Sequence, residues 1–146
     1  MKRILVGLDS SPRARTVLEA AVDLGRRTGA KLRLLRAVGL PPEMPASLWT
    51  SPPNQLLESF LASARVDLQD LARTVPPDLL DGITVQVGVG WDAICSAGRE
   101  LDADMIVIGS HGYGLLDRLV GTTAAKVVNH ADRSVLVVRN PERERR

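Results

Sequence analysis

Two glycine-rich stretches carry residue types that could hold a phosphate group. Residues 109–112, Gly-Ser-His-Gly, directly follow an unbroken apolar run at 105–108. Glycines that follow a buried strand let the backbone turn tightly and approach a ligand closely. Gly121, Thr122 and Thr123 stand where a helical pattern begins, and a helix start offers a phosphate free N–H groups and a positive dipole end. The spacing alone leaves open a second interpretation, in which these glycines only shape a strand-to-helix connection.

A third candidate for ligand contact is Asp9, near the N-terminus. The apolar residues at 4–8 before it predict a short buried strand. Ser11 and Pro12 after it predict the N-cap and the first residue of a helix. Asp9 therefore belongs to a strand-to-helix turn. Its carboxylate either caps the local backbone or accepts a hydrogen bond from a ligand at the mouth of the sheet.

The elements that position these residues alternate between strand and helix. Apolar runs predict buried strands, strict alternation predicts a half-exposed edge strand, and helical spacing of apolar residues predicts amphipathic helices. The predicted strands lie at 3–8, 32–38, 83–89, 105–108 and 135–138, with the edge strand at 83–89. The predicted helices lie at 12–28, 55–73, 93–101 and 122–130. Asp92 is the expected cap of the third helix, and Ala125 and Val128 are expected to face inward in the fourth.

Alternating strands and helices predict an α/β fold, a doubly wound parallel sheet with helices on both faces and right-handed crossovers. Such sheets bind ligands outside the carboxyl ends of the strands, where the strand order reverses. The two turns that most resemble ligand sites follow the first strand, at Asp9, and the fourth strand, at 109–112. If both turns serve one site, these strands are neighbours. The order is then 3-2-1-4-5, which also leaves the third strand at an edge.

Length and composition restrict the class of protein. The 146 residues are expected to form a single domain over 1–146. The net charge of +2 gives no reason to expect nucleic acid or a membrane as a partner, and Arg13 is expected to belong to a solvated surface. Cys95 is expected to be a small core residue rather than a nucleophile. No apolar run approaches the ~18 residues of a membrane helix, so a cytoplasmic protein is expected.

The stretch 39–54 contains prolines at 41, 42, 45, 52 and 53, which exclude a regular helix or a central strand. A loop of this length in a compact domain is either functional or mobile, and this one could fold over a ligand or over a partner subunit. Trp49 is a candidate anchor within it.

Three blocks of the sequence, residues 4–11, 103–112 and 129–139, resemble the universal stress protein family. The resemblance covers essentially the whole chain. It implies a five-stranded parallel sheet in the order 3-2-1-4-5, of the adenine nucleotide alpha-hydrolase-like, or Rossmann-like, type. It also implies a homodimer in which the last strand, Val135, Leu136, Val137 and Val138, pairs with its two-fold mate. An exposed apolar edge strand suits such pairing.

The same resemblance implies an ATP site. In ATP-binding members, the aspartate after the first strand and the backbone at the end of the second hold adenine. Ribose and phosphates lie along a Gly-x-x-Gly-x9-Gly-Ser/Thr motif. The residues that match these nucleotide-binding positions, or flank them, are Gly7, Asp9, Ala37, Ile108, Gly109, His111, Gly112, Gly121, Thr122 and Thr123.

The spacing of the phosphate motif departs from the family pattern. Between Gly112 and Gly121 this chain has eight residues, 113–120, where the pattern has nine. Either the connector is one residue tighter, or Thr122 and Thr123 take the final Gly-Ser place. The first option keeps a glycine where the backbone must come close to a phosphate and is preferred here.

Three functions follow as hypotheses. The first is an ATP-binding stress-response switch or sensor, with AMP or ADP as other adenine nucleotides and with Mg²⁺ bound through the phosphates. The second is a dimeric interaction scaffold of the same family that binds no nucleotide. The third, an enzyme, finds little support, because the phosphate turn contains no lysine and no evident carboxylate to activate water. His111 is the one candidate acid or base there, so very slow ATP hydrolysis or none is expected.

Overall fold

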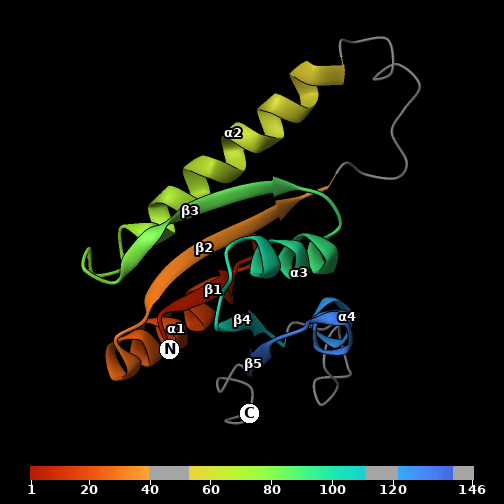
Figure 1. Ribbon diagram of the computed structural model, residues 1–146. Coiled ribbons are helices and arrows are strands. Elements are labelled where there is room, and N and C mark those ends of the chain that lie inside the picture. The colour runs from red at the N-terminus through yellow and green to blue at the C-terminus, as the bar shows by residue number, and fades with distance from the viewer. Residues whose placement is uncertain (40–52, 111–121, 140–146) are drawn as a thin grey trace, which may run out of the picture.

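A computed structural model describes residues 1–39, 53–110 and 122–139 of the chain. Within them, five parallel strands form one sheet in the order β3-β2-β1-β4-β5 (Figure 1). The strands are β1 (Arg3–Gly7), β2 (Lys31–Val38), β3 (Leu80–Val87), β4 (Met105–Gly109) and β5 (Ser134–Val138). The predicted fold class and strand order are confirmed.

Four described helices connect the strands: α1 (Ala14–Thr28), α2 (Pro53–Ala72), α3 (Gly90–Glu100) and α4 (Thr122–His130). Helices α1 and α2 pack in one apolar core on one face of the sheet, and α3 and α4 pack in a second core on the other face (Figure 1). None of the helices in this described part of the chain combines the length and apolar character that crossing a bilayer requires.

The centre of the sheet is buried on both faces. Ile4, Leu5 and Val6 of β1 have no exposed surface, and β4 pairs with β1 from Ile4 opposite Met105 onward. An unbroken apolar run suits a strand covered by helices on both sides. Because β1 and β4 are parallel neighbours, the turns that follow them lie side by side at the carboxyl ends of the strands.

Strand β3 lies at one edge of the sheet, as its alternating pattern predicted, but its bounds differ from the predicted 83–89. It begins at Leu80, which pairs with Leu32 of β2. It ends before Gly88, whose φ of 144° turns the backbone out of the strand. Few other residues adopt this angle without strain, and the Gly88 N–H still donates to the Val38 carbonyl at 2.9 Å.

The prediction that Ser11 and Pro12 begin the first helix was wrong. Helix α1 begins at Ala14, and Ser11 belongs to the turn before it. The Ser11 carbonyl accepts from the Ala14 N–H at 3.1 Å, and its hydroxyl accepts from the Arg13 N–H at 3.3 Å. The serine hydroxyl therefore satisfies a backbone donor of the turn. The Asp9 carboxylate holds Ser11 in this turn by accepting from its N–H and its hydroxyl.

Two expectations for the other face of the sheet also need correction. Helix α3 begins at Gly90, so Asp92 lies in its first turn and makes no side-chain cap. Helix α4 buries Ala124 and Val127, whereas Val128 is 51% exposed. Helical spacing alone leaves the rotation of a nine-residue helix uncertain by one position, and packing against α3 decides it.

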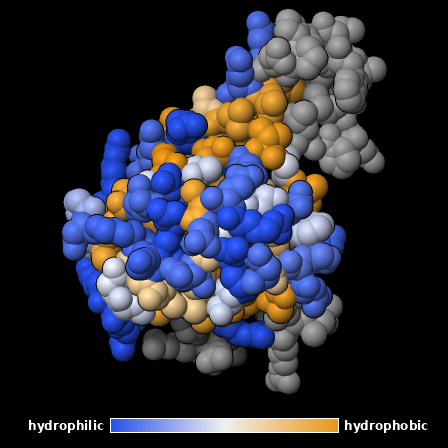
Figure 2. Space-filling model, viewed as in Figure 1, coloured by the Kyte–Doolittle hydropathy of each residue, from blue (hydrophilic) through white to orange (hydrophobic). Residues whose placement is uncertain are grey.

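Helix α2 extends past the end of the sheet. The helical spacing of its apolar residues puts Phe60 and Leu68 on one face, but only one of these two side chains is buried. Leu68 has no exposed surface, whereas Phe60, nearer the N-terminus of α2, is 38% exposed. The N-terminal end of α2 projects beyond the strands (Figure 1). Figure 2 shows hydrophobic side chains gathered over this projecting part.

Asp104 anchors the start of β1. Its Oδ2 accepts hydrogen bonds from the backbone N–H groups of Lys2, at 2.7 Å, and Arg3, at 2.9 Å. These bonds, the one from Arg3 first, lower the pKa of the Asp104 carboxyl from its ordinary 3.8. The folded chain therefore binds this proton less readily than the unfolded chain.

Replacement of Asp104 by alanine is expected to lower the stability of the protein in a pH-dependent way. Because the folded-state pKa is depressed, the stabilisation is fully present above the unfolded-state pKa and is lost as the pH falls through the folded-state pKa. The stability difference between the wild type and D104A should be constant near neutral pH and should shrink below 3.8. Urea unfolding at several pH values measures it. In the control E100A, which removes an exposed carboxylate from the end of α3, no comparable change should appear.

Candidate functional site

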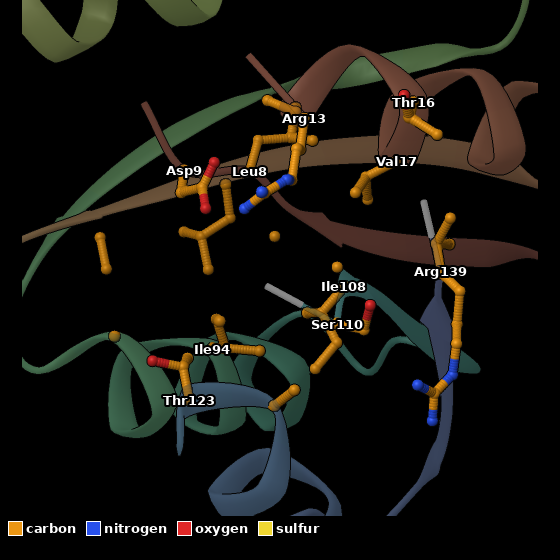
Figure 3. A pocket seen from close by; sticks show the side chains of 18 residues that line it. Leu8, Asp9, Arg13, Thr16, Val17, Ile94, Ile108, Ser110, Thr123 and Arg139 are labelled. Atoms are coloured by element: carbon orange, nitrogen blue, oxygen red, sulfur yellow. The ribbon is translucent and has the colours of Figure 1, made fainter. Parts of the chain in front are cut away.

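A cavity opens at the carboxyl ends of β1 and β4 (Figure 3). Asp9, Arg13 and Val17 line it from the side of β1 and α1. Ile94 of α3 and Thr123 of α4 line it from the opposite side. The wall thus combines residues from both faces of the sheet.

Most of the predicted site residues that the structure describes lie around this one cavity. The predicted residues that line it are Gly7, Asp9, Ala37, Ile108, Gly109 and Thr123. Thr122 begins α4 but does not line the cavity. His111, Gly112 and Gly121 lie outside the described residues, as do the connector 113–120 and the proline-rich residues 40–52. The roles of these residues in binding stay predictions.

The structure shows the local cap that was considered for Asp9, and it places the residue at the cavity. Its Oδ1 accepts from the Ser11 N–H at 2.9 Å and from the Ser11 hydroxyl at 2.7 Å, which is a local turn cap. Both of these bonds from Ser11 end on Oδ1. Since Asp9 is exposed and lines the cavity, its Oδ2 can accept a donor from a ligand.

The inner part of the cavity is apolar. Val17, Leu35, Ile94 and Ile108 contribute to its lining. An engineered apolar cavity of roughly 150 Å³ accommodates benzene. The volume of ≈ 200 Å³ found here is therefore enough for a purine ring. Larger polar parts of a ligand would have to extend toward the open side.

Two arginines at the cavity were not anticipated. Arg13, expected on a solvated surface, is half-buried and lines the cavity between Asp9 and α1 (Figure 3). Arg139 lines it from the end of β5. The position of Arg13 in the turn after β1 could have revealed it, because that turn faces the site. Arg139 could not be found this way, since only the pairing of β5 with β4 brings it close.

The turn between β3 and α3 is a further contributor that the sequence did not point to. Gly90 lines the cavity, and a Cβ atom at this position would lie 3.6 Å from the Thr123 methyl carbon. Gly90 and Thr123 are thus close neighbours at the starts of α3 and α4. The glycine between two apolar stretches gave only a turn signal.

Cys95 lies on the buried side of α3, in the apolar core that α3 and α4 share. Its side chain is 3% exposed, and this burial raises the pKa of the thiol. A buried thiol that resists ionisation is a poor nucleophile. The expectation of a small core residue is confirmed.

Replacement of Gly7 by valine is expected to destabilise the fold by about 1–3 kcal/mol and to narrow the cavity. A Cβ atom at Gly7 would lie 3.1 Å from Ile108 Cγ2 and 3.2 Å from Ile94 Cδ1, and the γ carbons of valine would reach further. Urea unfolding measures the loss. The matched substitution G90A places its Cβ in ordinary contact, so it should be neutral or slightly stabilising at the start of α3. Equal losses in both variants would contradict the close packing at Gly7.

Comparison with known proteins places this architecture. The sequence model of the Universal stress protein family matches residues 1–139. Universal stress protein A homolog 1 of Coxiella burnetii is 30% identical over 138 residues, which are 94% of this chain and 95% of that protein. The solved structure of universal stress protein UspA from Lactobacillus plantarum is 30% identical, has a TM-score of 0.72, and is matched over 94% of this chain and 97% of its own.

A further solved structure, a universal stress protein in complex with cAMP, shares the fold at 23% identity. Its TM-score is 0.60, and the match covers 94% of this chain and 96% of that one. The family model and the relatives cover nearly the whole chain, and the strand order agrees with the order that the resemblance implied. The chain belongs to the universal stress protein family.

Proposed function

We propose that this protein binds ATP in the cavity at the carboxyl ends of β1 and β4. The observation that carries the proposal is the composition of this cavity. An apolar interior of purine size lies next to the carboxylate of Asp9 and the arginines 13 and 139. A purine needs an apolar slot and a few well-placed polar groups, and phosphates need donors and positive charge. The cAMP complex of a structural relative supports an adenine nucleotide as the ligand class.

Each described group has a physical role in this proposal. Asp9 accepts a hydrogen bond from the adenine amino group or from a ribose hydroxyl. The backbone of Ala37, at the end of β2, contacts the adenine edge. Thr122 and Thr123 begin α4, and their backbone N–H groups and hydroxyls donate to the phosphates. The helix dipole favours a phosphate at this position.

The phosphates of the ligand are also bound by Gly109, His111, Gly112 and Gly121. Mg²⁺ would be held through the phosphates of the nucleotide and would neutralise part of their charge. AMP and ADP would occupy the same adenine site with fewer phosphate contacts.

At the level of the whole protein, we propose a cytoplasmic homodimer that acts as a stress-response switch or sensor. Strand β5 supplies the dimer contact, because it is a sheet edge and Leu136 on it is 39% exposed. Nucleic acid and membranes are not proposed as partners. Hydrolysis of ATP is expected to be very slow or absent, well below the ~1 per second of ordinary enzymes.

Titration of the full-length protein with ATP tests the proposed site. Isothermal calorimetry and thermal melting, with ADP, AMP and cAMP in parallel and with and without Mg²⁺, should show saturable binding and a raised melting temperature. GTP is the control that keeps the phosphates and changes the base. Absence of a melting shift at millimolar ATP, together with no nucleotide co-purifying, would instead leave the scaffold hypothesis. A shift that GTP reproduces in full would contradict adenine recognition.

A further inference from the structure

Arg36 is a buried arginine on the strand next to Asp9. It lies on β2, and it is 7% exposed, the one charged side chain in the buried class among the described residues. Arg36 is not part of the cavity lining, whereas its neighbours Leu35 and Ala37 are. Side chains alternate along a strand, so Arg36 points to the α1 and α2 face while Leu35 and Ala37 point to the cavity.

The guanidinium of Arg36 bonds mainly to the backbone of the turn after β1. Its Nη2 donates to the Asp9 carbonyl at 2.7 Å, and its Nε donates to the Leu8 carbonyl at 3.4 Å. The remaining contact joins Nη1 to Asp67 Oδ2 of α2 at 3.4 Å. The Asp67 side chain is 59% exposed, and ion pairs to exposed carboxylates contribute little. The bond to the Asp9 carbonyl is therefore the dominant contact.

The bond from Arg36 to the Asp9 carbonyl forms just beyond the last backbone hydrogen bond between this segment and β2. The Leu8 N–H donates to the Leu35 carbonyl at 2.9 Å. Beyond Leu8, Asp9 and Arg36 both line a groove between the turn and α2. Without Arg36, water from the groove could hydrate the Asp9 carbonyl, so the arginine supplies position more than solvation. Its rigid planar fork restrains the Asp9 backbone, while the Asp9 carboxylate faces the nucleotide cavity.

We propose that Arg36 is a positioning residue for Asp9. It sets the affinity for adenine nucleotide by holding the Asp9 backbone from behind, without touching the ligand. This inference rests on the proposed function for its effect on affinity. Its structural part, the restraint of the Asp9 turn, can be measured without nucleotide.

The first test compares two arginines of the same strand. Arg36→Met keeps much of the apolar stem and loses every donor. Arg33→Met is the matched control, because Arg33 pairs with Asp81 at 3.2 Å with a side chain 24% exposed, and it does not line the cavity. Both variants remove one positive charge. R36M is expected to weaken ATP binding about tenfold, whereas R33M should stay within about twofold of the wild type. Equal affinities of R36M and wild type would overturn the proposal.

Hydrogen exchange provides a readout that needs no ligand. The Ser11 N–H donates to Asp9 Oδ1, so its protection reports the position of the Asp9 carboxylate. In R36M this amide should exchange faster than in the wild type, and in R33M it should not. If wild type fails to bind ATP, the proposed function falls, and this measurement still decides whether Arg36 restrains the turn. Unchanged Ser11 protection in R36M would overturn the restraint.

A double-mutant cycle with Asp9→Asn separates positioning from general stability. If Arg36 acts through Asp9, R36M should cost little further affinity in the D9N background. A full, additive loss there would show a merely structural role and overturn the proposal. Arg36→Lys is the variant to use should R36M not fold. It keeps the charge but not the fork, so it should reproduce part of the affinity loss and of the faster Ser11 exchange, and wild-type values for both would count against the proposal.

Discussion

Replacement of Asp9 by asparagine is expected to lower the affinity for ATP about 10- to 100-fold while leaving the melting temperature of the free protein nearly unchanged. A hydrogen bond to a charged group contributes about 1.5–3 kcal/mol, which corresponds to this range of affinity. Asparagine retains one oxygen, which can keep the 2.9 Å and 2.7 Å bonds from Ser11. Its NH₂ group then replaces Oδ2 and presents a donor to the donor of the ligand. Calorimetric titration measures the affinity.

The comparison with Asp9→Ala separates the two roles of the carboxylate. Alanine removes both the Ser11 cap and the ligand acceptor, so D9A should lose stability as well as affinity. A cap of this kind is typically worth about 1 kcal/mol. If D9N bound ATP as tightly as the wild type, Asp9 would act in this protein only as a turn cap.

Replacement of Leu136 by lysine is expected to convert the proposed dimer to a monomer at micromolar concentration. Leu136 lies on the edge strand β5 and is 39% exposed in the single chain. Pairing of β5 with its two-fold mate would bury this position, and a buried charge without a partner costs about 3 kcal/mol or more, roughly 100-fold in dissociation constant. Sedimentation equilibrium of the wild type and L136K measures the change.

The control for this substitution is Val128→Lys. Val128 is 51% exposed and lies on α4 rather than on the edge strand, so V128K adds the same charge and removes a similar apolar side chain. It should leave the dimer intact. A wild type that is monomeric, or a dimer that L136K leaves unchanged, would exclude β5 as the dimer contact.

The fold could be predicted from the sequence because its signals are local. Continuous apolar runs such as 4–6 and 106–108 occur where strands are covered on both faces, and the structure leaves these residues almost without exposed surface. The alternation of apolar and polar residues at 83–89 predicted the edge strand, because such alternation occurs where one face of a strand is exposed. The strand order followed from requiring two polar turns, at Asp9 and at Gly109, to meet at one site.

Element ends and helix rotation were less predictable, because neighbouring elements decide them. Helix α1 begins at Ala14 rather than at Pro12, since the Asp9 carboxylate organises the preceding turn. Helix α4 buries Val127 rather than Val128 because it packs against α3. In α2, Phe60 fits the apolar pattern but is 38% exposed. The N-terminal end of this helix projects beyond the sheet, which therefore cannot cover it.

The sequence by itself therefore predicted the order of the strands and the end of the sheet where the cavity lies, with Asp9 among the residues that line it. The tertiary structure alone decided which other residues surround that aspartate. Ile94 and Arg139 reach the cavity from distant parts of the chain, and Arg36 reaches the Asp9 carbonyl from behind. Hydrophobic periodicity records which face of an element is buried. It carries no information about contacts between residues far apart in the chain, and those contacts build the site.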